Sequence, residues 1–405
     1  MRVVFLAPAY PAEMPEFVRG LAQVGAHVIG VGEGPLSAVD PTVRPYLSEY
    51  LQVPRLFDEH NLVARVVAYI HKHPVDRVEA LWEPLVIAAA RIREAVGLPG
   101  MSADTVRGFR DKQLMKERVR AAGLRVPHSA RVRTEAQTWA AAERIGFPLI
   151  LKPIAGAGSA DTHRCDSPAD LEKALKTTRH VTEASCEEFI DGEEFTYDTV
   201  CVEGRPVYEN VAQYLPRPLI ARTNEWISPA IITVRHLDQP AIRPGIELGR
   251  GVLSALGMGT GFTHMEWYKK SNGEVVFGEI GCRPGGARLV DQMNYTSDID
   301  LFVEWARAVC WGHIATLPPR QYNTAIIFKR AKGTGRIRHI TGLQQYLERH
   351  GSAVMVDALL RPGQHRRDWM QTLVSDGYLI VRHPEWRGAV ALADEAARHI
   401  ALFAE

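Results

Sequence analysis

The stretch HMEWYKKSNGEVVFGEIGCRPGG, residues 264–286, decides how the rest of the chain is interpreted. Two strand-like runs, Thr263–Lys269 and Val275–Gly281, flank the pair Asn272-Gly273. Asn-Gly between two such runs is a strong short-range signal for a β-hairpin, because both residues tolerate the positive φ angles of a tight turn. The stretch is therefore predicted to be an antiparallel hairpin with Asn272 and Gly273 as its two turn residues.

A two-residue turn at that point fixes which side chains face each other. Glu266 then lies directly across from Glu279, with the two Cβ atoms about 5 Å apart, where like charges destabilise a sheet. Such carboxylates usually share a proton or hold a cation, and Mg²⁺ takes oxygen ligands and completes its shell with water and phosphates. The hairpin is either a Mg²⁺ site or a solvated edge hairpin with two exposed glutamates.

Composition is that of an ordinary globular protein. The chain has 405 residues, 46% hydrophobic and 23% charged, and this length favours about three domains. A net charge of +1 gives no broad field for nucleic acid or a membrane surface, so neither partner is expected. Five scattered cysteines without a CxxC spacing argue against disulfides or zinc. No apolar run reaches the ~20 residues of a membrane span, and we expect a cytoplasmic protein.

The N-terminal part alternates strand-like and helical patterns. Apolar runs at Arg2–Pro8, Ala26–Val31 and Val78–Trp82 are separated by helical segments. Such alternation predicts an open parallel sheet with helices on both faces. No GxGxxG follows the first run, so a dinucleotide-binding role has little support. Residues 1–97 are predicted to form a Rossmann-like domain that builds one wall of a cleft.

Lys152 ends an apolar run and precedes a loop that contains Gly156, Gly158 and Ser159. Small residues let backbone N–H groups close on phosphate oxygens, and the lysine adds a positive charge. The segment is not a P-loop, because the lysine precedes the glycines. It is either a phosphate-binding loop or a flexible surface turn.

Two further charged segments have open interpretations. Lys112 stands at the start of a predicted helix, where a cation is unfavourable with the helix dipole. A nearby anion would account for it, or it is simply exposed. The acidic run CEEFIDGEEFTYD, Cys186–Asp198, predicts a strand–turn–strand. It is either a hinge that binds a base and ribose hydroxyls or a solvated hairpin.

Arg283 lies on the same face as Glu279, four residues further on, and a glycine pair follows it before a predicted helix. Arginine suits bidentate binding of phosphate or carboxylate, and a helix N-terminus favours anions. Arg288, about one turn further on, is either a second clamp or a surface charge. His264 shares the face of the metal-site candidates and is either near substrate or a packed core histidine.

Together these motifs resemble the ATP-grasp superfamily of carboxylate–amine ligases, over about Ser102–Trp311. The GCRPGG form is similar to amino-acid-ligase-like members rather than to D-alanine ligases or biotin carboxylases. The chain after residue 320 is similar to the small β-rich cap of the biotin-carboxylase-like branch. The resemblance implies ATP and Mg²⁺ (or Mn²⁺) as cofactors, with Glu266 and Glu279 as the metal ligands. It implies nucleotide binding by Lys112, Lys152, Gly156, Gly158, Ser159, Glu187, Glu188, Phe189, Ile190 and Glu194.

The resemblance also implies roles in the chemistry. It makes Arg283 and Lys152 catalytic, and it makes Arg283, Arg288 and His264 substrate contacts. The loop RPLIARTNEWIS, Arg217–Ser228, is a further candidate for substrate contact. One position departs from the family: many members have asparagine two residues after the second metal carboxylate, and this chain has Gly281. A second metal ion would therefore be held less fully.

The expected fold class is α/β and α+β multidomain: the Rossmann-like domain, a two-lobed ATP-grasp fold and a small β-rich C-terminal cap. We expect a linker helix region at 98–124, the lid subdomain at 125–198, the catalytic subdomain at 199–320 and the cap at 321–405. The last element is predicted to be a helix, Ala389–Phe403.

The expected function is an ATP-dependent ligase that activates a carboxylate as an acyl phosphate and couples it to an amine. ADP and phosphate would be released, and small carboxylates and amines would be the partners. A bicarbonate-activating carboxylase and a non-catalytic nucleotide-binding switch are the alternatives. A homodimer is expected from the family alone.

Overall fold

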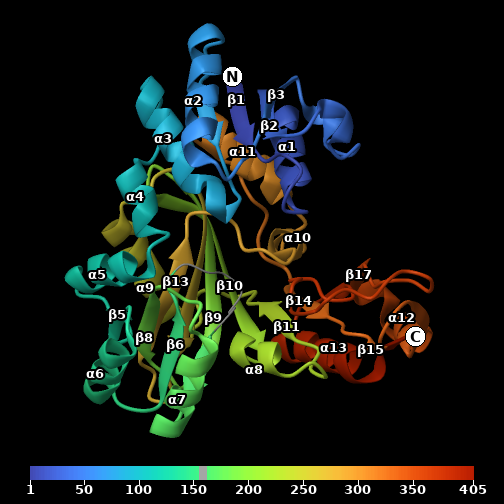
Figure 1. The fold of residues 1–405 in the computed structure, drawn as a ribbon. Coiled ribbons are helices and arrows are strands. Elements are labelled where there is room, and N and C mark those ends of the chain that lie inside the picture. Colours follow the sequence, from blue (N-terminus) through green and yellow to red (C-terminus); the bar gives the residue numbers. More distant parts are fainter. Residues whose placement is uncertain (155–161) are drawn as a thin grey trace.

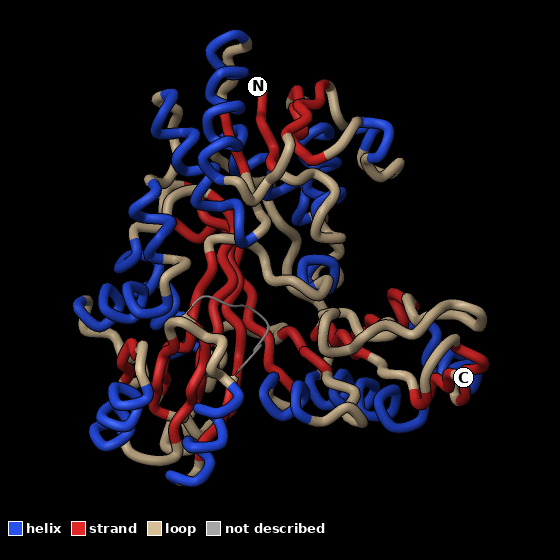
Figure 2. Tube along the Cα trace, in the orientation of Figure 1, coloured by secondary structure: helices blue, strands red, loops and turns tan. Residues whose placement is uncertain are grey.

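The computed structural model describes residues 1–154 and 162–405, and helices pack around its β-sheets (Figures 1 and 2). The N-terminal sheet is parallel, as the alternating pattern predicts, with strand order β3-β2-β1-β4. Its strands are β1 (Arg2–Leu6), β2 (His27–Glu33), β3 (Glu49–Val53) and β4 (Arg77–Glu79). The sequence patterns missed β3, because its first four residues are only half-buried or exposed and do not form an apolar run.

Helices cover both faces of this sheet. On one face lie α2 (Glu59–Lys72) and α3 (Val86–Val96), and on the other lie α1 (Met14–Gln23) and α11 (Leu301–Trp311). Trp305 of α11 packs edge-on against Phe5 and Phe17, with ring centroids 6.2 and 5.1 Å apart. Because α11 comes from a distant part of the chain, this packing fastens the N-terminal sheet to the rest of the molecule.

The segment predicted to be the lid, which we call the lid below, contains a four-stranded antiparallel sheet of order β5-β8-β6-β7. Its strands are β5 (Ser129–Val132), β6 (Leu149–Pro153), β7 (His163–Cys165) and β8 (Ala184–Glu188), and its helices are α6 (Glu135–Ile145) and α7 (Pro168–Thr177). Two helices, α4 (Ala103–Gly108) and α5 (Lys112–Ala121), connect it to the N-terminal sheet. The loop predicted to bind phosphate, with Gly156, Gly158 and Ser159, lies outside the described residues.

The largest sheet has eight strands in the order β13-β12-β9-β10-β11-β14-β18-β17. They are β9 (Glu193–Val202), β10 (Arg205–Leu215), β11 (Ala230–Thr233), β12 (Gly261–Lys269), β13 (Val275–Gly281), β14 (Asn323–Phe328), β17 (Val354–Asp357) and β18 (Tyr378–His383). The helices α8 (Pro218–Thr223), α9 (Arg243–Leu256) and α10 (Leu289–Asn294) belong to the same stretch of chain. The C-terminal strands thus extend the sheet that carries the hairpin.

A small sheet of order β15-β19-β16 completes the C-terminal part. It contains β15 (Lys332–Gly333), β16 (Ile337–Thr341) and β19 (Ala401–Ala404), with α12 (Leu343–His350) and α13 (Trp386–His399) beside it. The helix predicted to run to residue 403 therefore ends at His399, and its last residues form a strand. None of the helices in the described part of the chain is long and apolar enough to cross a membrane.

The hairpin pairs Glu266 with Glu279, as predicted, although the length of its turn and the register beside the turn differ from the prediction. The Lys270 amide donates to the Glu274 carbonyl (2.9 Å), so the turn contains three residues rather than two. A β-bulge at Gly278 then shifts the register by one and restores the predicted pairing. Gly278 has no room for a side chain, because a Cβ there would lie 2.8 Å from the Glu266 carbonyl oxygen.

Candidate active site

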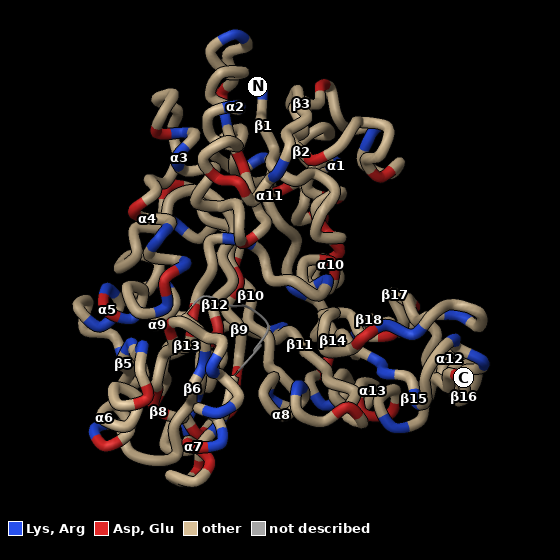
Figure 3. The backbone as a smooth tube through the Cα atoms, viewed as in Figure 1, with Lys and Arg blue, Asp and Glu red and all other residues tan. Residues whose placement is uncertain are grey.

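A cleft lies between the lid and the β12–β13 hairpin. Its lining includes every described residue that the sequence predicts to bind nucleotide or metal: Lys112, Lys152, Glu187, Glu188, Phe189, Ile190, Glu194, Glu266 and Glu279. Charged residues of both signs occur side by side in this region (Figure 3). Elements from the lid, from α5 and from the large sheet thus bring together side chains that are far apart in the sequence.

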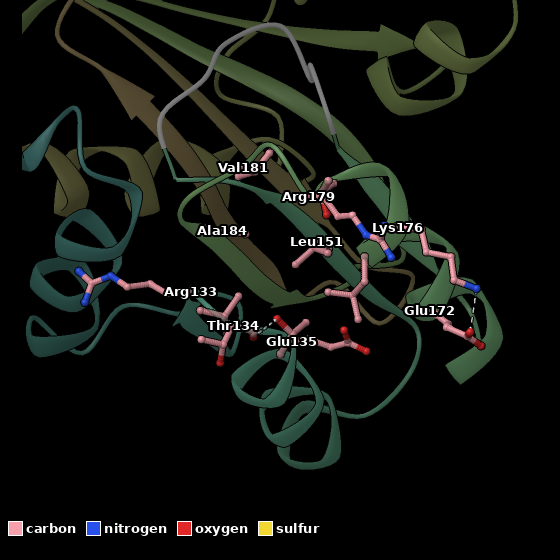
Figure 4. A pocket seen from close by; sticks show the side chains of 13 residues that line it. Arg133, Thr134, Glu135, Leu151, Glu172, Lys176, Arg179, Val181 and Ala184 are labelled. Atoms are coloured by element: carbon pink, nitrogen blue, oxygen red, sulfur yellow. Dashed lines mark hydrogen bonds and ion pairs between the residues drawn. The ribbon is translucent and has the colours of Figure 1, made fainter.

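Strand β6 separates this cleft from a larger cavity inside the lid. Side chains alternate between the two faces of a strand, so Ile150 and Lys152 line the cleft while Leu151 lines the lid cavity. Figure 4 shows this second cavity, of about 300 Å³, beside Thr134 and Lys176. It contains none of the predicted site residues, so the smaller cleft is the candidate site.

Glu187 lies buried between two lysines. Its carboxylate binds Lys152 Nζ at 3.0 Å on one side and the fully buried Lys116 on the other. Burial would raise the pKa of Glu187, but the two ammonium groups lower it below its ordinary value. Burial lowers the pKa of Lys116 to about 8, against the attraction of Glu187. The sequence patterns missed Lys116, although it follows Lys112 by four residues and so shares its helix face.

Lys112 reaches across the cleft and binds Glu279. This anion accounts for a lysine in the first turn of α5, which Asp111 caps by accepting from the Gln113 and Leu114 amides. Burial would raise the pKa of Glu279, but Lys112 and Lys152 lower it to about 2. Its side chain is therefore ionised at neutral pH.

The pKa of Glu266 is shifted in the opposite direction from that of Glu279. Burial, and next the charge of Glu279 across the hairpin, raise the pKa of Glu266 above its ordinary value. Its Oε1 accepts a hydrogen bond from the Tyr214 hydroxyl (3.1 Å). A half-buried carboxylate pair in which one partner resists ionisation is an arrangement that a divalent cation would relieve.

The two carboxylates alone do not make a complete metal cage. No group of three or more His, Cys, Asp or Glu side chains among residues 1–154 and 162–405 is placed to hold an ion by itself. The oxygen-only donors Glu266 and Glu279 fit Mg²⁺ or Mn²⁺, because Mg²⁺ is commonly bound by one or two carboxylates with water and phosphate oxygens. The site thus suits a metal ion that arrives with a phosphate-bearing molecule.

His264, on strand β12 of the hairpin, is bound by the buried acid Asp198 of β9. Its Nδ1 lies 2.6 Å from Asp198 Oδ1, and its Nε2 lies 3.9 Å from Glu266. Burial would lower the pKa of His264, but Asp198 and then Glu266 raise it above the ordinary value. The ring is thus largely buried and lies beside Glu266, and a contact between His264 and a substrate stays a prediction.

The hinge segment after β8 lies at the other end of the cleft. The Glu188 carboxylate is bound to Arg125 (2.8 Å), and the Phe189 amide donates to the Pro148 carbonyl (3.2 Å). Arg217 donates to the Ile190 carbonyl (2.9 Å) and binds Glu194 (3.0 Å). The Phe189 amide and the Ile190 carbonyl of this hinge therefore already have protein partners.

Glu194 is the buried carboxylate at this end of the cleft. Burial, reinforced by Glu266, raises its pKa to about 7, against the attraction of Arg217. Arg217 belongs to the loop predicted to contact substrate, but its guanidinium lies in the candidate nucleotide cleft, 5.0 Å from the centroids of both the Phe189 and Tyr268 rings.

Arg283 is fixed by a residue from the N-terminal domain. Its Nε donates to Glu83, in the 3₁₀ turn Glu83–Leu85 after β4, and Glu83 also binds Arg110. Burial would lower the pKa of Arg283, but Glu83 raises it above the ordinary value. A Cβ at Gly281 would make only ordinary van der Waals contacts with this pair, 3.4 Å from Arg283 Cγ and 3.6 Å from a Glu83 oxygen. No local pattern in the sequence indicates Glu83.

Arg288 is engaged elsewhere. Its backbone amide donates to Glu13 (3.0 Å), and its guanidinium lies 3.7 Å from Asp291. It adopts a left-handed backbone conformation, φ 62°, directly before α10. Its side chain is not among the groups that line the cleft.

Comparisons with known proteins agree with this geometry. The models of two families match the chain: the ATP-grasp N-terminal domain over residues 22–100 and the ATP-grasp domain over residues 145–291. An L-arginine-specific L-amino acid ligase of Bacillus subtilis is 25% identical over 236 residues, which is 56% of each chain. An alanine–anticapsin ligase of B. subtilis strain 168 is 27% identical over 281 residues, 64% of this chain and 59% of that protein. The chain thus spans little more than half the length of these relatives.

Solved structures share the fold over the whole chain. An L-amino acid ligase from Bacillus licheniformis superimposes with a TM-score of 0.80 at 20% identity, covering 100% of this chain and 98% of that one. An N5-carboxyaminoimidazole ribonucleotide synthetase from Thermotoga maritima gives 0.71 at 17% identity, covering 100% and 99%. The two family matches, together with this fold, identify the protein: the chain belongs to the ATP-grasp superfamily.

Proposed function

We propose that the protein is an ATP-dependent ligase that activates a carboxylate as an acyl phosphate and couples it to an amine. The observation that carries this proposal is the pairing of Glu266 with Glu279 at one end of a cleft that Lys112 and Lys152 also enter. Two glutamates and two lysines around one cleft suit a polyphosphate with its cation. The lysines can pair with phosphate oxygens, and the glutamates can bind the cation.

The nucleotide would lie along the cleft. Lys112 and Lys152 would contact phosphate oxygens, and the hinge from Glu187 to Ile190 would adjoin the base. Glu194 would accept from the ribose hydroxyls, a role in which Arg217, now bound to it, would have to give way. Glu266 and Glu279 would hold Mg²⁺, which when bound neutralises charge on the β- and γ-phosphates.

The reaction would proceed in two steps, phosphoryl transfer and then attack by the amine. A carboxylate oxygen attacks the γ-phosphorus, the bond to the ADP oxygen breaks, and the acyl phosphate forms. The amine nitrogen then attacks the acyl carbon, the bond to the phosphate oxygen breaks, and the nitrogen loses a proton. Arg283 would hold the oxyanions in both steps, and Lys152 would stabilise the charge that develops during phosphoryl transfer.

Two kinds of similarity support this proposal. By their names, two relatives are an L-arginine-specific L-amino acid ligase and a ligase of alanine and anticapsin. The solved L-amino acid ligase shares the fold along the full chain. A homodimer stays a prediction from the family.

The test is ADP and phosphate release over a matrix of carboxylates and amines, with each product identified by mass. We expect turnover that requires both substrates and yields an amide. Release with bicarbonate as the sole acid would instead indicate a carboxylase. Nucleotide binding without turnover on any pair would indicate a switch.

Glu279→Gln and Glu274→Gln make a matched pair for this assay. Glu274 is on the same hairpin and binds Lys270 and Arg125 outside the cleft. Glu279→Gln should abolish substrate-dependent phosphate release with the fold intact, and Glu274→Gln should keep it. Full activity of Glu279→Gln would overturn the proposed role of the pair.

A further inference from the structure

The two lysines proposed to contact phosphate oxygens are each bound to a glutamate. Lys112 Nζ contacts Glu279 Oε2, and Lys152 Nζ lies 3.0 Å from Glu187 Oε2. The two lysine side chains are only 12% and 18% exposed, so water screens these ion pairs weakly. Each lysine must therefore give up a protein partner before it can bind a phosphate.

Glu187 has a second cation that stays when Lys152 moves. Its other carboxylate oxygen, Oε1, contacts Lys116, whose side chain is 1% exposed. The two oxygens of Glu187 thus serve separate lysines. Departure of Lys152 leaves the buried carboxylate paired, which avoids the large cost of an unpaired buried charge.

Glu279 has no second cation of this kind. In the part of the chain that the structure describes, Lys112 is the one residue that forms an ion pair with its carboxylate. Glu266 faces it across the hairpin and is a like charge when ionised. If Lys112 moved away with nothing in its place, two facing carboxylates would be left without a bound cation, which is unfavourable.

The ammonium group of Lys112 also opposes a metal ion at the same carboxylate. A divalent cation bound to Glu279 would lie within a few ångströms of that ammonium, where positive charges repel strongly in a poorly hydrated cleft. Lys112 and a metal ion are therefore alternative partners of Glu279.

We propose that Lys112 keeps divalent cations away from Glu279 until a nucleotide phosphate binds the lysine in its place. Lys112 thereby couples the two binding events, and by linkage a metal ion at Glu279 favours release of the lysine to the phosphate in equal measure. This inference rests on the proposed nucleotide and metal site, because it assigns Lys112 a second role there. The carboxylate pair binds a metal ion well only together with a phosphate-bearing molecule.

The experiment measures Mn²⁺ binding by calorimetry in the absence of nucleotide and substrates. Lys112→Gln removes the cation from Glu279 and should bind Mn²⁺ about tenfold more tightly than the parent, within the range that couplings between two sites commonly reach. Lys112→Arg keeps a cation in that place and should bind Mn²⁺ as weakly as the parent.

Two further lysine variants are the controls. Lys270 is on the same hairpin but binds Glu274 (2.7 Å) outside the cleft, so Lys270→Gln should bind Mn²⁺ like the parent. Lys152→Gln removes a positive charge from the cleft without freeing Glu279. It should tighten Mn²⁺ binding less than Lys112→Gln does, and an equal gain would show a general charge effect and overturn the inference.

ADP binding supplies a second measurement, with Mn²⁺ present in one arm and EDTA in the other. In the parent, Mn²⁺ should tighten ADP binding by a larger factor than in Lys112→Gln, because only the parent must release Lys112 from Glu279. The factor for Lys112→Arg should be close to that of the parent. Equal factors in all three proteins would overturn the coupling by Lys112.

Failure of the coupling and failure of the nucleotide site have different signatures. If Lys112→Gln and the parent bind Mn²⁺ equally while the parent binds ADP with Mn²⁺, the role of Lys112 is overturned and the nucleotide site stands. The parent also gives a test that needs no variant, since Mn²⁺ affinity as tight without ADP as with it would overturn the inference. If the parent binds ADP in neither arm, the proposed nucleotide site fails and the inference with it.

Discussion

Glu83, at the carboxyl end of β4, accepts a hydrogen bond from Arg283 Nε across 200 residues of sequence. The contact joins the N-terminal parallel sheet to the loop that follows the β12–β13 hairpin. Arg110 binds the same carboxylate, so Glu83 holds two guanidinium groups. This carboxylate orients the arginine that we propose for the acyl phosphate, and the N-terminal domain thus contributes to the geometry of the reaction.

Glu83→Gln should therefore lower kcat by about 10- to 100-fold, because small displacements of a positioned group cost rates of this order. KM for ATP should change little, since Glu83 does not line the nucleotide cleft. Glu49→Gln is the control: Glu49 belongs to the same domain and binds Arg2, His27 and Tyr69 away from the site. Equal kcat in the two variants would contradict the positioning role.

Gly278→Ala should disrupt the bulge that brings the two hairpin acids together. The added Cβ would meet the Glu266 carbonyl oxygen at 2.8 Å, and overpacking of this kind costs about 1–3 kcal/mol. Denaturant unfolding should report this loss, and calorimetry should report weaker Mg²⁺-dependent ADP binding. Gly273→Asn, at the tip with φ 87° and open space around it, should cost less than about 1 kcal/mol. Comparable binding losses in both variants would argue against the bulge.

Glu194 should make stability fall as pH rises. Its pKa is about 7 in the folded protein, because burial and Glu266 disfavour its charge, against an ordinary value of 4.5. The folded state thus keeps a proton that the unfolded state has lost, and this stabilisation is complete below pH 4.5 and lost as pH rises through 7. Urea unfolding at pH 5.5 and pH 8 should show Glu194→Gln gaining stability relative to the parent at the higher pH. A pH-independent difference would contradict the raised pKa.

The sequence carries the local features of the site well. The Asn-Gly turn predicts the hairpin, and the facing of Glu266 and Glu279 is confirmed. The predicted turn was one residue too short, and the bulge at Gly278 compensates for it. A glycine inside a strand is a known sign of a bulge. The sequence does not indicate which residue of the strand is left without a partner, because that depends on the neighbouring strand. The correct pairing was therefore reached with an incorrect turn.

Contacts between distant segments could not be predicted. Glu83 lies in a short Trp-Glu-Pro sequence that indicates only a turn, and its partner Arg283 lies 200 residues further along the chain. Lys116 is buried. The polar composition of its helix would instead predict a lysine on a solvated face. The roles of Lys152, Arg283 and the other site residues stay predictions, and those of Gly156, Gly158 and Ser159 lie outside the described residues.

Transfer of ¹⁸O tests the central claim most directly. If a substrate carboxylate attacks the γ-phosphorus and the amine then expels phosphate, one carboxylate oxygen must leave with that phosphate. We therefore expect an ¹⁸O-labelled carboxylate substrate to give phosphate carrying one ¹⁸O per amide formed, measured by mass spectrometry. Amide formation with unlabelled phosphate would show that the carboxylate was not activated in this way.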